Sequence, residues 1–252
     1  MSGHSKWSTI KRKKGAADAK RGALFTKLAR EIQIAAREGA DPEANFKLRL
    51  VIDKARSENM PKDNIERAVL RGAGLEKGDA LEEVMYEGYG PHGVAVLTHV
   101  VTDNRNRAVA ELRHLFGRAG GSLGEQGCVA WQFESKGYIT ITIEPDDADP
   151  MDLFEWAVEA GADDVELSED LVEVFTALEQ FKTVQDALVE RGVSLETAEI
   201  SWIPSNTITL EGKQALQNMA LIDSLEELDD VTHVYTTLDI TDEIIAALEA
   251  EE

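Results

Sequence analysis

The sequence predicts an α+β protein in which an N-terminal three-helix domain precedes two ferredoxin-like βαββαβ domains. Two observations lead to this prediction. Through about residue 75, apolar residues recur at helical spacing, three or four residues apart. From Gly93 onward, short runs rich in β-branched residues alternate with amphipathic segments, as in βαβ connections. With 252 residues and 43% hydrophobic content, the chain is long enough for two or three domains with buried cores.

The first predicted helix runs from Ala19 to Glu38 and has two chemically different faces. Its bulky apolar residues fall within one arc of about 120° around the helix axis. Those residues are Leu24, Phe25, Leu28, Ile32, Ala35 and Ala36. Four cations fall on the opposite arc, namely Lys20, Lys27, Arg30 and Arg37. We therefore expect one face to pack into a core and the other to face water or an anion. Gly39 is expected to end the helix.

Two shorter helices are predicted to complete the N-terminal domain. Asp41 is expected to cap the second helix, because its side chain accepts from free N–H groups and Pro42 suits the first helical position. Pro61 is expected to start the third helix, and Gly72 to close it. Residues 74–78 are predicted to form a linker.

Strands and helices alternate after this linker. Strands are expected at residues 94–102, 128–133, 138–143, 165–167, 172–177, 200–203, 207–210 and 231–238. Asp103 is expected to cap the helix that follows the first of these strands. The order of elements fits two βαββαβ units. Periodicity leaves open whether the units follow in series or one is inserted inside the other.

Charge is strongly segregated along the chain. The formal net charge is −22, yet residues 1–37 carry ten basic and two acidic side chains, a net charge of +8. Residues 38–77 are balanced, and residues 78–252 carry a net charge of −30. Exposed charges more than about 8 Å apart are largely screened at physiological salt, so the basic segment can lie on phosphates despite the acidic remainder. The alternative interpretation is a solvated basic tail that maintains solubility.

A second polar feature is the stretch TDNRNRA at residues 102–108. Arg105 and Arg107 are two of only eight basic residues after residue 77. They adjoin Asn104 at a strand-to-helix junction, where short polar side chains are also ordinary helix caps. The stretch is therefore either a contact surface for phosphate or a partner, or a cap whose arginines bridge to the acidic body.

Signals for catalysis, cofactors and membranes are weak. The five histidines show no metal-ligand spacing, and Cys128, the only cysteine, fits a reducing cytoplasm. No base can be nominated for Cys128, and the glycines of GGSLGEQG (120–127) fit a helix end and loop better than a phosphate cradle. We expect no cofactor, metal, secretory signal or membrane span.

Several stretches coincide with motifs of a known family. They are GHSKWSTIKRKKGAADAKRG, FTKLAREI, DPEANFKLR, NMPKDNIERA, YEGYGPHGVAVL and TDNRNRAVAELRHLFGRAGGSLGEQGCVAWQF, which cover most of residues 3–133. In order and spacing the chain resembles the YebC family. The rest of the chain fits more loosely, and His92 and Cys128 stand where glycine and serine are usual in the family.

The resemblance implies a nested arrangement and a role in gene expression. The expected domains are a basic helical domain at 1–77, a ferredoxin-like domain at 80–135 plus 204–252, and an inserted ferredoxin-like domain at 136–203. The family is described as probable DNA-binding transcriptional regulators, and its relatives are also linked to translation. The expected nucleic-acid-binding residues are Lys6, Trp7, Lys11, Arg12, Lys13, Lys14, Lys20, Arg21, Lys27, Arg30, Asn104, Arg105 and Arg107.

Three hypotheses of function follow. The first is a cytoplasmic, non-enzymatic regulator that binds DNA. The second is a translation factor that binds ribosomal RNA and relieves stalling; its acidic domains would contact basic ribosomal proteins, a use for the charge of −30 that the DNA hypothesis lacks. An enzyme is the third and weakest, because no nucleophile–base or metal set can be assembled.

Overall fold

The computed structural model describes residues 18–78, 80–143, 148–168 and 171–251. These residues form two compact units. The smaller unit comprises Glu134–Ile203, and the larger combines the described parts of Ser2–Phe133 and Pro204–Glu252. The chain therefore leaves the larger unit after Phe133 and returns to it at Pro204. The three-domain boundaries expected from the sequence stay a prediction.

From Asp18, where the described part of the larger unit starts, three helices and a short 3-10 turn follow one another. They are α2 (Asp18–Ala35), η1 (Ala36–Glu38), α3 (Phe46–Ser57) and α4 (Lys62–Gly72). The apolar arc expected for the first helix is buried at Leu28 and Ile32, which share a cluster with Leu48 and Ile65 of the next two helices. Amphipathic spacing thus predicted both the helices and the faces that pack.

The start of α3 differs from the sequence prediction. Asn45, rather than Asp41, is the N-cap, and its side chain accepts a hydrogen bond from the Leu48 N–H at 3.0 Å. The same amide donates to the carbonyl oxygens of Ala35 and Gly39, both at 2.8 Å. An amide has both donor and acceptor atoms, so buried Asn45 joins two helix ends, which a carboxylate does not do. Asp41 instead accepts from the Glu43 N–H in the preceding turn.

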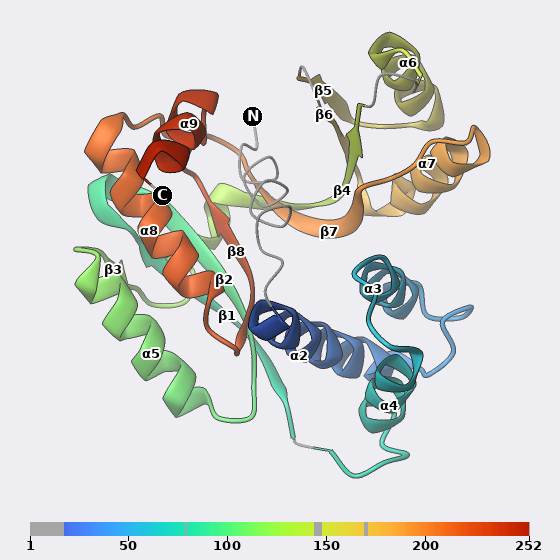
Figure 1. Cartoon of the computed structure of the whole chain (residues 1–252), viewed down its shortest axis with the longest axis horizontal. Helices are drawn as coiled ribbons and strands as arrows, with labels where there is room; N and C mark the ends of the chain where they lie inside the picture. The colour runs from blue at the N-terminus through green and yellow to red at the C-terminus, as the bar shows by residue number, and fades with distance from the viewer. Residues whose placement is uncertain (1–17, 79, 144–147, 169–170, 252) are drawn as a thin grey trace. The chain divides into compact units, whose positions relative to one another are not determined.

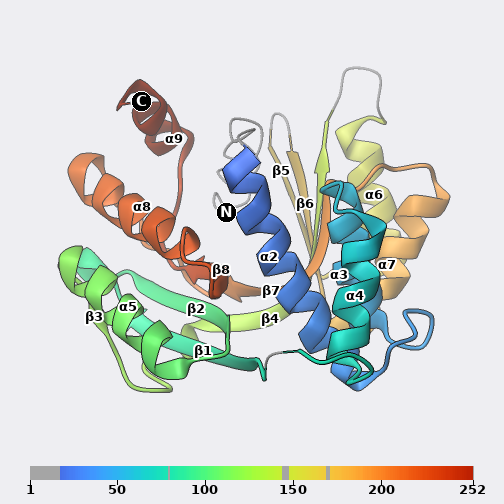
Figure 2. The ribbon, with the colours of Figure 1, turned by 60° about the horizontal axis from the view of Figure 1, so that its bottom comes forward.

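The rest of the larger unit is a four-stranded antiparallel sheet with helices (Figure 1). Its elements are β1 (Glu82–Tyr89), β2 (Ala95–Thr102), α5 (Arg105–Arg118), β3 (Ser122–Leu123), α8 (Gly212–Glu226), β8 (Val231–Thr236) and α9 (Asp242–Glu251). The strand order is β3-β1-β2-β8, and β1 and β2 form an antiparallel hairpin. Figure 2 shows α5 and α8 over one face of this sheet.

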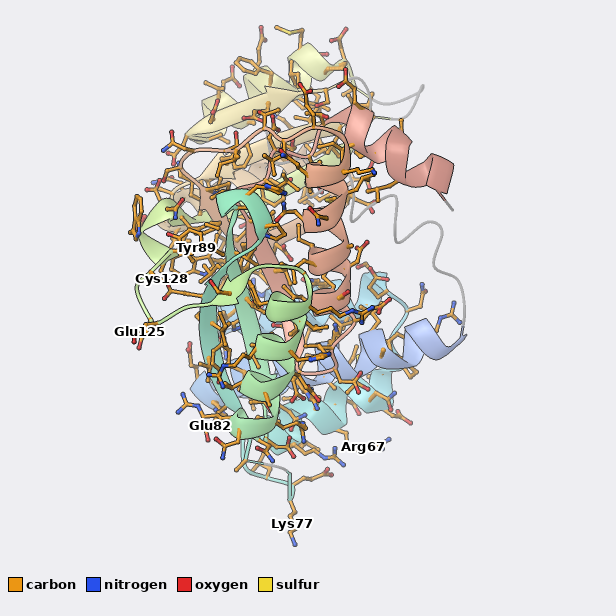
Figure 3. The ribbon with its side chains drawn as sticks, turned by 90° about the vertical axis from the view of Figure 1, so that its left-hand side faces the viewer. Arg67, Lys77, Glu82, Tyr89, Glu125 and Cys128 are labelled. Carbon is orange, nitrogen blue, oxygen red and sulfur yellow. The ribbon has the colours of Figure 1, made fainter. Side chains whose placement is uncertain are left out.

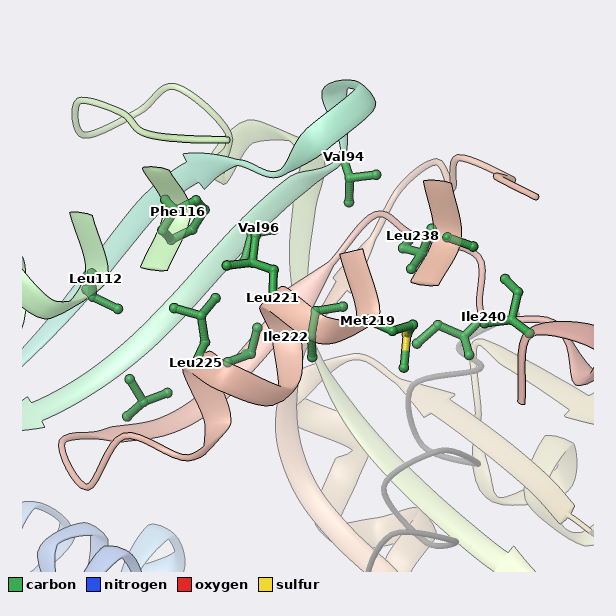
Figure 4. Close-up of a cluster of buried hydrophobic side chains, with 14 of the residues drawn as sticks. Val94, Val96, Leu112, Phe116, Met219, Leu221, Ile222, Leu225, Leu238 and Ile240 are labelled. Atoms are coloured by element: carbon green, nitrogen blue, oxygen red, sulfur yellow. The ribbon is translucent and has the colours of Figure 1, made fainter. Parts of the chain in front are cut away.

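The core of this sheet lies between its strands and the two helices (Figure 4). Two residues of β2 that lie on one face, Val96 and Val100, are buried in the same cluster as Phe116 of α5 and Ile222 of α8. Successive side chains of a strand point to opposite faces, which places His99 on the other face. There the ring of His99 lies 5.9 Å from that of His233.

The order of elements in this sheet corrects the sequence prediction. The sheet has the order ββαβ before the second unit and αβ after it, instead of βαββαβ. The prediction missed β1 because its three acids and Gly88 interrupt the alternation of apolar residues. Glu87 of β1 is nonetheless 4% exposed, since its carboxylate accepts from the N–H groups of Gly127, Val129 and Ala130 at 2.6–2.8 Å.

Two further strands expected from the sequence are absent from this region as the structure describes it. Residues 130–132 form a 3-10 turn, and the N–H group of Ala130 at its start donates to Glu87. At residues 207–210 the structure shows only an isolated parallel bridge between Ile208 and Leu238. Both segments carry apolar residues of the kind found in strands, and such residues alone do not distinguish a short strand from a turn or a loop.

The smaller unit has the order βαββαβ. Its elements are β4 (Phe133–Thr142), α6 (Pro150–Ala160), β5 (Asp164–Leu167), β6 (Leu171–Thr176), α7 (Leu178–Glu190) and β7 (Thr197–Pro204). The strand order is β5-β6-β4-β7. Glu173 is buried on β6 and its carboxylate accepts a hydrogen bond from the hydroxyl of Tyr138 on β4. Burial raises the pKa of Glu173 to about 7, with Glu166 adding to the rise and Tyr138 opposing it.

Candidate nucleic-acid interface

The residues expected to bind nucleic acid divide into three groups. Six of them lie outside the described residues: Lys6, Trp7, Lys11, Arg12, Lys13 and Lys14. Four belong to α2, of which Arg21 is exposed, and Lys20 has a described backbone only. The remaining three lie at the start of α5. The structure therefore gives the contacts of the cationic side chains on α2 from Arg21 onward and of those at the start of α5.

Two cations of α2 are engaged with the protein's own acidic turn between α8 and β8. The ammonium of Lys27 donates to the carbonyl oxygen of Glu226. The guanidinium of Arg30 donates to the carbonyl oxygen of Asp229 at 2.5 Å and to the carboxylate of Asp230 at 2.7 Å. These side chains hold α2 against the sheet. Their expected role toward phosphate stays a prediction.

Asp230 is the centre of a network of charged and polar groups. It is 4% exposed and accepts from Arg30, from the Thr102 hydroxyl at 2.8 Å and from Arg107 at 2.7 Å. Burial favours the neutral acid, but these hydrogen bonds and the two guanidinium charges outweigh it and hold the pKa of Asp230 below its ordinary value of 3.8. A charged carboxylate thus joins α2, β2 and α5 at one point.

The stretch TDNRNRA forms the N-terminus of α5. Asn104, rather than the expected Asp103, is the N-cap and accepts from the Arg107 N–H at 3.1 Å. Arg107 also pairs with Asp103 at 2.7 Å and with Asp230, and these partners raise its pKa further above its usual range. Arg105 pairs with Glu82 at 3.1 Å across an exposed surface. The structure therefore shows the cap whose arginines bridge to acids, one of the two interpretations that the sequence left open.

A cleft of about 520 Å³, which the sequence patterns did not predict, lies between α2 and α4. Its chief polar side chains are Arg30 and Gln33 of α2 and Asn64, Arg67 and Arg71 of α4. Arg67 and Arg71 are exposed, and neither forms an ion pair or hydrogen bond with any residue that the structure describes. Figure 3 labels Arg67 on α4.

The net charge of this segment gives no sign of the cleft, because residues 38–77 carry equal numbers of basic and acidic side chains. The available signal was the spacing of Arg67 and Arg71, which are four residues apart and share one face of a helix. Of the two acids of the same helix, Glu66 pairs with Lys62 at 3.4 Å, and Asp63 lies one turn before Arg67. A balanced segment can thus present a cationic face.

The loop around Cys128 forms no reactive site. Tyr89, Glu125 and Cys128 lie together at one end of the sheet (Figure 3), and the Tyr89 hydroxyl donates to the Cys128 carbonyl oxygen at 3.0 Å. Burial and the nearby Glu87 charge raise the pKa of the Cys128 thiol, which disfavours the nucleophilic thiolate. Among the described residues, no group of His, Cys, Asp and Glu side chains could hold a metal ion. No helix among the residues that the structure describes has the length and apolar character that a membrane span requires.

Comparisons with known proteins identify the family. Residues 5–75 match the model of the TACO1/YebC protein N-terminal domain, and residues 81–238 match that of the TACO1/YebC second and third domain. A "probable transcriptional regulatory protein" of Trichlorobacter lovleyi is 53% identical over 242 residues, which are 96% of this chain and 97% of the relative. A protein of Dictyoglomus turgidum with the same description is 51% identical over 249 residues, which are 98% of this chain and 100% of that relative.

A solved structure agrees with this assignment. The crystal structure of a conserved hypothetical protein from Aquifex aeolicus is 44% identical, with a TM-score of 0.83 over 90% of this chain and 94% of that one. The family model and the relatives' descriptions denote regulatory proteins, which agrees with the expectation that the chain is not an enzyme. Matches to both family models, together with relatives about half identical over nearly the whole chain, show that this chain belongs to the TACO1/YebC family.

Proposed function

We propose that the protein is a cytoplasmic, non-enzymatic regulator of transcription that binds DNA through its basic N-terminal segment and α2. The observation that carries the proposal is the charge of +8 on residues 1–37 of a chain whose total is −22. Lys and Arg side chains that neutralise phosphates supply most of the sequence-independent affinity for nucleic acid. The relatives described as probable transcriptional regulatory proteins support the same role.

The contacts of α2 narrow the set of residues that can reach DNA without rearrangement. Arg21 is exposed and forms no ion pair with a described residue, so it is available to a phosphate. Lys27 and Arg30 would have to leave the turn around Asp230 first. The binding charge is therefore assigned chiefly to Lys6, Lys11–Lys14, Lys20 and Arg21, with Trp7 stacking on a base or anchoring the segment.

A second candidate function is binding to ribosomal RNA as a translation factor. It is favoured by the net charge of −30 on residues 78–252, which would complement basic ribosomal proteins and has no use in contact with DNA. In the first function, that surface would instead contact proteins of the transcription machinery.

Salt dependence tests the proposed interface. For about six neutralised phosphates on duplex DNA, log K should fall with log salt concentration with a slope of about −5. The combined substitution Lys11→Ala, Arg12→Ala, Lys13→Ala and Lys14→Ala should abolish binding and leave thermal unfolding nearly unchanged. A slope near zero, or unimpaired binding by this variant, would refute the proposal.

Crosslinking in cells followed by sequencing of the bound nucleic acid separates the two functions. Fragments of promoter DNA are expected for a transcriptional regulator. Recovery of ribosomal RNA fragments in their place would support the translation factor and refute transcription as the role.

A further inference from the structure

We infer that the cleft between α2 and α4 binds a phosphate group of the nucleic-acid backbone, held by the guanidinium groups of Arg67 and Arg71. This inference rests on the proposed function and extends it, because the interface then includes a second helix outside the basic N-terminal segment. The cleft is a formed concavity of about 520 Å³, within the range of small-ligand sites and large enough for one nucleotide.

Arg67 and Arg71 lie one helical turn apart on α4, a spacing at which like charges repel each other and destabilise a helix. Neither has a partner among the residues that the structure describes. A bound anion would remove this repulsion, and a planar guanidinium matches the oxygens of a phosphate with two parallel hydrogen bonds.

The other charged groups that line the cleft do not neutralise this pair. Asp103 is the acidic residue of the lining, and its carboxylate is held by Arg107 at 2.7 Å. Opposite α4, Arg30 of α2 adds a third guanidinium, which Asp230 neutralises. The local potential is therefore set by the two unpaired arginines and favours an anion.

Neutral polar side chains accompany the charged groups of the cleft. Asn64 lies on α4 one turn before Arg67, and Gln33 lies across from it on α2, so neutral amide donors and acceptors line the same space. Phe25 of α2 also reaches the lining, but its ring is partly buried against the helical core, so the cleft is assigned to a phosphate rather than to a base.

Binding measurements on the full-length chain test the inference. The double variant Arg67→Ala, Arg71→Ala should lose roughly tenfold in affinity for a duplex DNA oligonucleotide at physiological salt. Its salt slope should fall by about 0.9 for each phosphate that is no longer neutralised. Alanine is the best helix former, so the variant should unfold at the same temperature as the wild type. The affinity of Arg67→Lys, Arg71→Lys should fall between the two, because lysine keeps the charge but does not form the paired hydrogen bonds.

The matched control is Arg113→Ala, Arg118→Ala on α5. Both arginines are exposed and form no pair with a described residue, so the control removes the same charge from another helix of the same unit. Its affinity and salt slope should stay within about twofold of the wild type, because neither arginine lines the cleft. If the cleft variant behaves like this control while the wild type binds nucleic acid, the inference is refuted and the proposed function stands.

Binding of a small phosphate compound tests the cleft separately from the binding of nucleic acid. In a titration of the full-length protein with inorganic pyrophosphate, the NMR signals of the Arg67 and Arg71 side-chain Nε–H groups should shift, and those of Arg113 and Arg118 should not. Equal shifts of all four refute the inference. Shifts at the cleft with pyrophosphate or a nucleoside monophosphate, but no binding of any oligonucleotide, would identify a free nucleotide as the ligand and overturn the nucleic-acid assignment.

Discussion

Replacing Asp230 with asparagine tests whether the acidic turn before β8 holds the first helix in place. The substitution preserves the shape of the side chain and removes its charge. Arg30 and Arg107 then lose the anion that both approach to 2.7 Å, while the introduced amide can still bond to the Thr102 hydroxyl. The perturbation therefore isolates the charged part of the network.

The expected cost follows from how far each pair is removed from water. The Arg30 and Asp230 side chains are 17% and 5% exposed, so this pair is poorly screened. Hydrogen bonds to buried charged groups contribute about 1.5–3 kcal/mol each. Arg107 is much more exposed and adds little. We expect Asp230→Asn to lower the free energy of unfolding of the larger unit by about 2 kcal/mol at pH 7, which is roughly 4–8 °C in Tm.

Calorimetry and urea denaturation between about pH 3 and pH 7 measure this change. The pKa of Asp230 is below 3.8 in the folded protein, so its stabilising effect is present above pH 3.8 and is lost as the pH falls through the folded pKa. The difference between variant and wild type should therefore shrink as the pH is lowered. Glu82→Gln, which breaks the exposed pair with Arg105, is the control and should change stability by less than about 0.5 kcal/mol.

The same variant has a second readout in binding. Removing the anion leaves the charge of Arg30 uncompensated, whereas Arg107 keeps its pair with Asp103, so affinity for nucleic acid should rise several-fold although stability falls. Equal stability of Asp230→Asn and Glu82→Gln at pH 7 would refute the reasoning about the network. A fall in affinity would show that the undisturbed position of α2 matters more for binding than its free charge.

Two other substitutions test the interiors of the two units. The pKa of Glu173 is about 7 in the folded protein and about 4.5 when unfolded, so the wild-type stability declines as the pH rises between these values. Glu173→Gln removes this titration and should therefore stabilise the smaller unit at pH 8, by no more than about 3 kcal/mol. Urea denaturation against pH should show that decline in the wild type and in Glu179→Gln but not in Glu173→Gln; the same decline in all three would contradict the assignment. Gly72→Ala should lower the Tm, at a cost of about 1–3 kcal/mol, because the new Cβ would lie 2.3 Å from the Gln33 carbonyl oxygen. Gly117→Ala in α5 meets nothing within 4 Å and should raise the Tm instead; a rise in both would show that α2 and α4 do not approach closely.

Local patterns determined a large part of the helical region. The apolar arc of α2 and the ends at Gly39 and Pro61 follow from periodicity and capping, which involve residues within a few positions of each other. The cap of α3 was misassigned to Asp41 because several short polar residues compete there, and only the ends of two helices meeting at Asn45 select it. The segregation of charge along the chain also followed from the sequence alone.

Only the tertiary structure decided the contacts between residues that lie far apart in the chain. Glu87 is buried in β1 because three backbone amides some forty residues later surround it. Arg30 meets Asp230 across 200 residues, and this contact turns a cation of the expected binding face into part of the scaffold. Arg67 and Arg71 become a candidate site only because α2 forms the opposite wall. Helix propensity and net charge add up along the chain, whereas burial and ion pairing depend on which surfaces the fold brings together.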